Sequence, residues 1–550
     1  MASLLANISN PARWWRFLER SFEGQTRRRL STQLDAAWKA VGPVPIKAQG
    51  TTLLADGMWF NPNHFFRLRL FCQAIGASSG VQLVGVLRRR DDRDARRALE
   101  RIGFREFIWL EEDREFRSID FVPEARRLLS VVRNHRDLLA LQMPEDIPAY
   151  VLYDTVLKLA RHPQPPIEHP LWCNTLAELL RNAAIYAREL ACRNVAHVVL
   201  SHPWKSEWAA LVWIALGRAI TTYHLTGFVE GMRIRRFRSR DDYATPVESL
   251  PPARFDALAP GVQAKIVEFG KADFERRISG RLADINASYA FHPEKRIDDR
   301  GAARCALSGQ SERPIAVVYS HVWYDFPHTF AMRNFTDFLD WIEVTIARCR
   351  SLTDRIWLLK PHPMDAWYGG FRLADVARDL PPHIRLLPLE TDSATAMLAA
   401  DAVVTVHGTI GLEAAAAGVP VLLADRSYFS DWGVATVAQS RDDYLRLLGE
   451  VSHLPTPDAT VRRRAQACFA LALAGPPEDA HALRMTCDSR VSDAYREILQ
   501  RLAKSRDDLA AEQRRIEEWL AQDEVDGFAA YHLLAAARRK QALVAQVTPA

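Results

Sequence analysis

A short apolar run followed by a stretch of helical period recurs along the chain, and this alternation constrains the fold most. Parallel strands need a long crossover connection, usually a helix, so such alternation is typical of layered α/β folds. We therefore predict an α/β fold with two Rossmann-like domains and a cleft between them. The expected strands are Thr51–Ala55, Val81–Leu87, Glu106–Leu110, Val195–Leu200 and Ala219–Tyr223 in the first half, and Pro314–Ser320, Arg355–Lys360, Ile384–Leu387, Ala402–Val406 and Val419–Ala424 in the second.

The chain has 550 residues, enough for about three domains. Proline-rich and charged stretches place the seam between the two α/β domains within residues 241–313. We predict an N-terminal helical segment at 1–45, a first Rossmann-like domain at 46–300 and a second at 310–455. A helical C-terminal region is expected at 456–550. In such a pair of domains the ligand lies at the carboxyl ends of the strands.

Charge and cysteine content narrow the class of protein. The chain has 72 Lys and Arg against 67 Asp and Glu, a net charge of +5, which argues against nucleic acid as a partner. Its seven cysteines form no CxxC pair, as expected of reduced thiols in the cytoplasm. No apolar run approaches the roughly 18–20 residues of a membrane span. We expect a cytoplasmic protein without a metal ion, since neither HExxH nor paired cysteines occur.

One candidate motif, Lys360-Pro361-His362-Pro363, directly follows an expected strand. The two prolines hold His362 in an extended conformation at the ligand edge of the sheet. There an imidazole can donate a hydrogen bond to a phosphate or a developing oxyanion, and Lys360 adds positive charge. The alternative is a strand-end histidine that fills a turn.

A second motif runs from Val406 through His407, Gly408 and Thr409 to Glu413. A strand ends, a glycine-containing turn follows and a helix begins, so free amides and the helix dipole form an anion site. Thr409 adds a hydroxyl, and Glu413, one turn further, suits the hydroxyls of a ribose. The alternative is a tightly packed junction in which Thr409 only caps the helix and Glu413 is solvated.

Together with Trp357–Lys360, Gly418–Val421, Tyr428 and Trp432-Gly433, these motifs resemble the donor domain of GT-B glycosyltransferases. They are most similar to capsule and surface polysaccharide biosynthesis proteins, among them bacterial Kdo transferases. The resemblance covers roughly residues 313–433. It implies a second domain that binds a CMP-, CDP- or UDP-linked sugar as substrate, with no cofactor. It implies His362 and Thr409 at the phosphate and Glu413 at the ribose. We predict that Lys360, Pro363, His407 and Gly408 also bind the donor.

The first domain would then bind the acceptor, a capsule or surface glycan or a lipid-linked glycan. Asp56, His202 and Glu207 each lie at or just after an expected strand, and each can deprotonate an acceptor hydroxyl. Either carboxylate can also act as a nucleophile. The alternatives are helix capping for Asp56 and Glu207 and a turn histidine for His202.

Residues 233–240 contain five arginines in eight positions. Arg233, Arg235 and Arg236 are candidates to bind an acidic glycan, a lipid pyrophosphate or anionic membrane heads. A solvated basic face is the alternative. Near the N-terminus, Trp14–Leu18 mixes aromatic and cationic residues, so the helix predicted there either contacts the inner face of a membrane or docks on the domain.

The leading hypothesis is therefore a metal-independent glycosyltransferase that extends a capsule or surface polysaccharide. A nucleotide-sugar epimerase and a phosphopolyol transferase remain open on the same fold. So does a non-catalytic scaffold for polysaccharide assembly.

Overall fold

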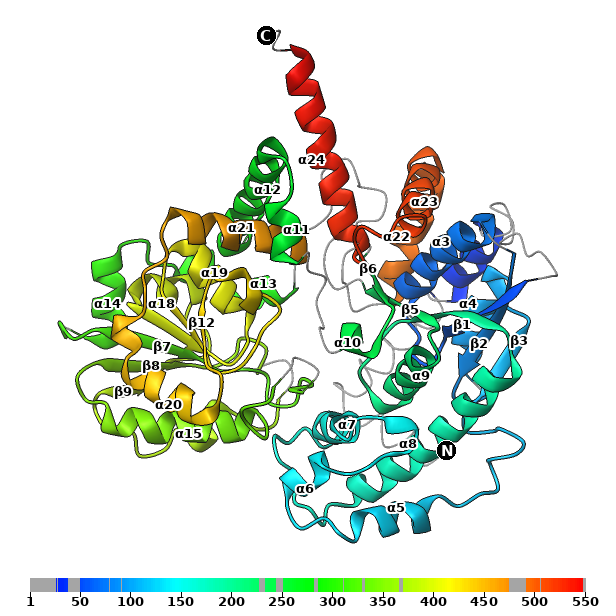
Figure 1. Ribbon diagram of the computed structural model, residues 1–550, viewed down its shortest axis with the longest axis horizontal. Coiled ribbons are helices and arrows are strands. Elements are labelled where there is room, and N and C mark those ends of the chain that lie inside the picture. Colours follow the sequence, from blue (N-terminus) through cyan, green and yellow to red (C-terminus); the bar gives the residue numbers. More distant parts are fainter. Residues whose placement is uncertain are drawn as a thin grey trace, which may run out of the picture.

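The computed structural model contains two parallel β-sheets, each covered by helices, that lie side by side (Figure 1). This confirms the prediction of two Rossmann-like α/β units. The structure describes residues 26, 28–37, 50–78, 80–90, 92–226, 233–243, 251–280, 285–309, 311–328, 332–365, 369–473, 491–504 and 506–547. The aromatic segment Trp14–Leu18 lies outside these residues.

The first sheet has the strand order β3-β2-β1-β4-β5-β6. All neighbouring pairs are parallel except β5 with β6, which is antiparallel. The order reverses between β1 and β4, so their carboxyl ends form the topological switch point where ligands bind in such folds. The strands are β1 (Thr51–Asp56), β2 (Val81–Leu87), β3 (Glu106–Trp109), β4 (Val195–Leu200), β5 (Thr221–Thr226) and β6 (Arg233–Phe237).

The second sheet repeats this topology with the order β12-β11-β10-β7-β8-β9, all parallel. Its switch point lies between β7 and β10. Both faces of the sheet are buried, which explains the continuous apolar composition of its strands. The strands are β7 (Ile315–Tyr319), β8 (Ile356–Lys360), β9 (Ile384–Leu386), β10 (Ala402–Thr405), β11 (Val421–Leu423) and β12 (Thr436–Val437).

Helices cover both faces of each sheet (Figure 1). The first half contains α3 (Pro62–Ser78), α4 (Arg93–Ile102), α5 (Val122–Leu129), α6 (His135–Leu139), α7 (Tyr150–Ala160), α8 (Pro170–Cys192), α9 (Ser206–Gly217) and α10 (Arg240–Tyr243). The remainder contains α11 (Pro252–Asp256), α12 (Pro260–Ile278), α13 (Ile285–Ala290), α14 (Arg300–Ser308), α15 (Phe338–Ser351), α17 (Leu373–Val376), α18 (Ser393–Ala399), α19 (Thr409–Ala417), α20 (Arg441–Gly449), α21 (Ala459–Ala472), α22 (Val491–Lys504), α23 (Arg506–Leu520) and α24 (Phe528–Val547). Short 3₁₀ turns lie at Pro144–Asp146, Pro293–Lys295, Ser430–Trp432 and Val451–His453.

Helices before and after the second sheet are shared between the two units. Helix α12 precedes the predicted boundary at 300–310, but it packs against α21 and α24, and α21 also packs on α19. The chain then returns to the first unit, where α22 and α23 pack on α3 through buried apolar residues. The four helices from α21 to α24 therefore cover both units rather than forming a body of their own. None of the helices within the described residues combines the length and the apolar composition that a membrane-spanning helix needs.

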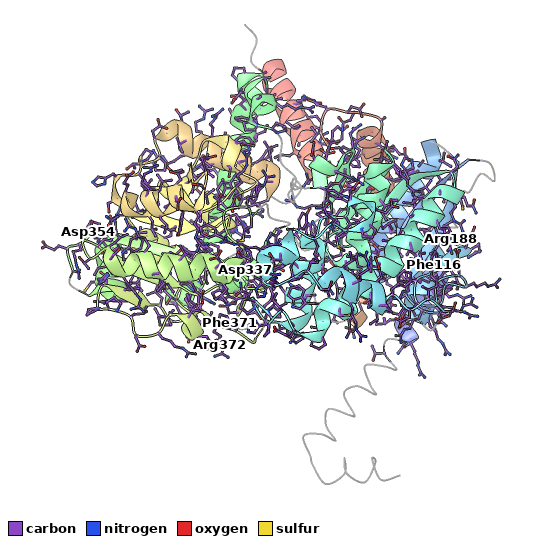
Figure 2. The ribbon with its side chains drawn as sticks, turned by 60° about the horizontal axis from the view of Figure 1, so that its bottom comes forward. Phe116, Arg188, Asp337, Asp354, Phe371 and Arg372 are labelled. Atoms are coloured by element: carbon purple, nitrogen blue, oxygen red, sulfur yellow. The ribbon has the colours of Figure 1, made fainter. Side chains whose placement is uncertain are left out.

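Helix α7 of the first unit joins the segment that follows β7. The Tyr153 hydroxyl donates to Asp337 over 2.7 Å, and His328 contacts the buried Asp154 carboxylate with its ring Nδ1 (2.7 Å) and its amide (3.1 Å). Figure 2 labels Asp337 at the boundary between the units. These buried polar contacts hold the carboxyl edges of the two sheets toward each other.

Candidate active site

Three histidines from three strand ends of the second sheet lie together. His321 follows β7, His362 follows β8 and His407 follows β10. The ring centroid of His321 is 5.7 Å from that of His362 and 5.1 Å from that of His407. Phe338, the first residue of α15, stacks on His321 with centroids 4.3 Å apart. The sheet topology therefore gathers three imidazoles at the switch point where a ligand is expected.

All three imidazoles are neutral at physiological pH. Burial lowers the pKa of His362 to about 3, and neighbouring His321 adds to this effect. Burial also lowers the pKa values of His321 and His407. The Nδ1 atom of His362 accepts a hydrogen bond from the amide of Met364 over 3.2 Å, so the ring hydrogen is on Nε2. His362 therefore presents an N–H donor without carrying charge.

An ion pair between the units lies close to these histidines. Lys158 of α7 donates to Asp325 over 2.7 Å. Burial alone would raise the pKa of Asp325, but Lys158, His321 and His362 together bring it below its usual value. The Asp325 side chain is 32% exposed, so an ionised carboxylate is accessible from solvent at this point.

His202, which follows β4, faces this region from the first unit. Its ring packs against Trp204, Trp208 and Phe326, and Phe326 belongs to the second unit. Burial, with smaller contributions from Lys205 and Lys158, lowers the pKa of His202 to about 3. The structure therefore brings the predicted His202 to the same boundary as Asp325.

The glycine turn is built as the sequence suggests, but Glu413 has a protein partner. Gly408 precedes α19, and Thr409 is its first residue. Arg277 of α12 donates to the buried Glu413 carboxylate over 2.6 Å. Both residues are largely buried, so in this structure Glu413 joins α19 to α12. Its predicted role at a ribose stays a prediction.

Lys360 and Asp365 flank His362 and are both buried. The Lys360 ammonium donates to the backbone oxygens of Leu389 (2.9 Å) and Pro361 (3.3 Å). Burial lowers the pKa of Lys360 to about 8 and raises that of Asp365 to about 7, although each group opposes the change in the other. Pro363 completes the motif beside His362. The Lys360 side chain thus stabilises the loop that contains His362.

The two predicted carboxylates of the first unit are also engaged within the protein. Asp56 is fully buried at the end of β1, and it accepts hydrogen bonds from the amide and the hydroxyl of Ser201, the latter at 3.0 Å. Glu207, in the first turn of α9, forms an ion pair with Arg88. Asp56 therefore joins β1 to β4 across the switch point, and Glu207 joins α9 to the end of β2.

The arginine-rich segment forms strand β6, and its buried arginine side chains bind backbone oxygens inside the fold. Arg233, Arg235 and Arg236 are buried and donate to the backbone oxygens of Ala472, Asp242 and Gln522, respectively. The contacts of Arg233 and Arg236 attach the C-terminal segment to the first sheet, and the contact of Arg235 joins β6 to α10. The residues do not form the open basic surface that the sequence suggested, because β6 pairs with β5 and is covered.

Sequence reasoning missed His321, Asp325 and Lys158. A signal for His321 was present, because Ser320-His321 follows its strand just as Ser201-His202 follows β4. Asp325 and Lys158 gave no such signal, since their pairing depends on how the two units face each other. Among the described residues, no group of three His, Cys, Asp or Glu side chains is arranged to hold a metal ion.

Comparisons with known proteins give low similarities. No protein-family model and no curated protein matches the chain. Solved structures that match include KpsC, a β-Kdo 2,4 transferase from Thermosulfurimonas dismutans, with 13% identity over 50% of this chain and 79% of that one (TM-score 0.35). UDP-GlcNAc 2-epimerase from Neisseria meningitidis has 8% identity over 83% of this chain and 100% of that one (TM-score 0.23). The glycotransferase of kitacinnamycin has 13% identity over 83% of this chain and 100% of that one (TM-score 0.23).

Proposed function

We propose that this protein is a glycosyltransferase that moves a sugar from a nucleotide-activated donor to a glycan. The observation that supports this most is the convergence of His321, His362 and His407 at the switch point of the second sheet. They lie opposite Lys158 and beside Asp325, so one region combines groups suited to a phosphate with an ionised carboxylate. The donor is a CMP-, CDP- or UDP-linked sugar, and no cofactor takes part.

In this proposal the diphosphate or monophosphate of the donor binds at the histidines. His362 offers its Nε2–H, and the first turn of α19, which begins two residues after His407, offers backbone amides. A bound anion favours the charged form of a nearby imidazole, so the pKa of His362 rises on binding. This adds stabilisation of the leaving phosphate when it is most negative.

Asp325 is the best-placed base for the acceptor hydroxyl. Its carboxylate is ionised and its side chain is 32% exposed, whereas Asp56 is fully buried and the Glu207 side chain is only 6% exposed. The pair with Lys158 keeps the Asp325 carboxylate charged and fixes its position. The acceptor is a capsule or surface glycan, free or lipid-linked, and the protein works in the cytoplasm, at most as a peripheral protein on the membrane.

Nucleotide binding tests the donor site. Thermal unfolding of the full chain is measured with CMP, CDP, UDP and GDP, and a nucleotide at 100 times its Kd should stabilise the fold by about 2.7 kcal/mol. Replacing His362 or His321 by Ala should weaken binding at least tenfold. His453→Ala, an exposed histidine of the same unit, is the matched control and should bind as the wild type does. If no nucleotide stabilises the protein, the proposal is wrong.

Turnover tests the reaction class. Release of the nucleotide from a donor sugar should depend on an added glycan acceptor and should fall strongly in Asp325→Asn. Conversion of the donor sugar without any acceptor would instead identify a nucleotide-sugar epimerase.

A further inference from the structure

A hollow lies on the first unit, away from the histidines. Its volume is about 370 Å³, within the range of small-molecule sites. One wall is the loops after β2 and β3, and the other is helix α8. The lining residues are Arg89, Glu111, Ile119, Asp120, Phe121, Val122, Asn174, Ala177, Glu178 and Arg181.

The polar wall offers hydrogen bonds of both kinds. The exposed side-chain amide of Asn174 makes no hydrogen bond to any other described residue, and the buried Nε of Arg181 has no partner among them either. Arg181 is 4.0 Å from Glu178, too far for a hydrogen bond. The hollow is lined by two arginines and by the three carboxylates of Glu111, Asp120 and Glu178. Its negative groups therefore outnumber its positive ones, and it does not favour an anion such as a nucleotide. Its donors and acceptors suit a ligand rich in hydroxyl groups.

The apolar part of the hollow supplies the other half of such a site. Ile119 is 48% exposed, although large apolar side chains are usually buried, and Phe121 is beside it. A sugar ring has C–H groups as well as hydroxyls, and the C–H groups can pack on these two side chains. The hollow therefore combines an exposed apolar surface with a larger share of polar groups, which matches the two kinds of surface on a sugar ring.

The loop that carries this wall is fixed in place. Arg188 of α8 donates to Asp113 over 2.6 Å and to Glu115 over 2.9 Å, and its guanidinium lies 5.2 Å from the ring centroid of Phe116. Figure 2 shows Arg188 and Phe116 next to each other. The loop after β3 is therefore held against α8 before any ligand binds, which lowers the entropic cost of binding.

The hollow and the proposed active site share one edge of the first sheet. Glu111 follows β3, His202 follows β4, and the order β3-β2-β1-β4 separates them by three strand spacings, about 14 Å. Between them Arg88, next to Arg89, pairs with Glu207. A chain of several sugar units that runs along this edge reaches both places.

We propose that the hollow binds a sugar unit of the acceptor glycan distant from the reacting end. This rests on the proposed function, and it adds that longer acceptors bind better than short ones. The wild-type chain is applied to a printed array of bacterial surface oligosaccharides of two or more units, together with the variants Asn174→Ala, Glu178→Ala and Ala177→Trp. The last variant fills the hollow. Glu124→Ala, on the exposed face of α5, is the control.

We expect wild type and Glu124→Ala to bind at least one oligosaccharide, and the three hollow variants to bind it at least tenfold more weakly. All of them should keep the wild-type affinity for the nucleotide, whereas His362→Ala should lose the nucleotide and keep the oligosaccharide. No binding by the wild type, or equal binding by hollow variants that melt at the wild-type temperature, would overturn the proposal. Failure of the donor site alone would show in the nucleotide measurement only.

Discussion

Replacing Asp365 by Asn should stabilise the protein at pH 8 but not at pH 4. Asp365 is 7% exposed, and burial raises the pKa of its carboxyl from 3.8 to about 7. The unfolded chain loses this proton near pH 4, whereas the folded chain keeps it until about pH 7. The unfolded state therefore binds fewer protons in this range, and the free energy of unfolding falls as the pH rises from 4 to 7.

The size of the effect follows from that pKa difference. At 1.36 kcal/mol per pH unit, the wild type loses roughly 4 kcal/mol between pH 4 and pH 8 through this group. An Asn side chain does not titrate in this range, so the free energy of unfolding of Asp365→Asn does not fall in this way as the pH rises. The variant also loses the attraction between the Asp365 carboxylate and the nearby Lys360 ammonium, and this cancels part of the gain. We therefore expect a net gain of roughly 2 kcal/mol at pH 8.

Urea unfolding, followed by tryptophan fluorescence at pH 4, 6 and 8, measures this gain. The matched control is Asp442→Asn, an exposed carboxylate in the first turn of α20, which should show no pH-dependent gain. An Asp365→Asn gain that is equal at pH 4 and pH 8, or a loss at pH 8, would refute the reasoning.

Three further predictions concern the contacts that join the parts of the molecule. Lys158→Met should raise the pKa of Asp325, because it removes the nearby positive charge, and so move the acid limb of the pH–activity profile to higher pH. Asp154→Ala leaves the His328 amide and ring without their partner, at about 1–3 kcal/mol each, and should lower the midpoint of thermal unfolding. Arg236→Met should expose the turn before α24 to limited proteolysis while the circular dichroism spectrum stays unchanged, because its bond to the C-terminal segment is lost.

The sequence predicted most strands and their ends because both depend on local composition. Buried parallel strands need continuous β-branched and apolar runs, so β1, β7 and β10 lie close to the predicted ranges. The histidines after β8 and β10 were found because a strand end fixes their edge of the sheet. Strand β6 escaped notice because its Arg-Ile-Arg-Arg-Phe sequence looks solvated, and only its cover of C-terminal helices makes it a buried strand.

By itself, the sequence determined the two α/β units, the edge at which a ligand binds and two of the three clustered histidines. The tertiary structure decided which charged groups are open to a ligand. Glu413 meets Arg277 across 136 residues, and Lys158 meets Asp325 across 167. Such ion pairs depend on how distant segments of the chain pack against each other. A charged side chain that is paired inside the fold is not available to a ligand in the way that its local sequence suggests. Local pattern therefore predicts where the site lies, and packing selects the residues that can act in it.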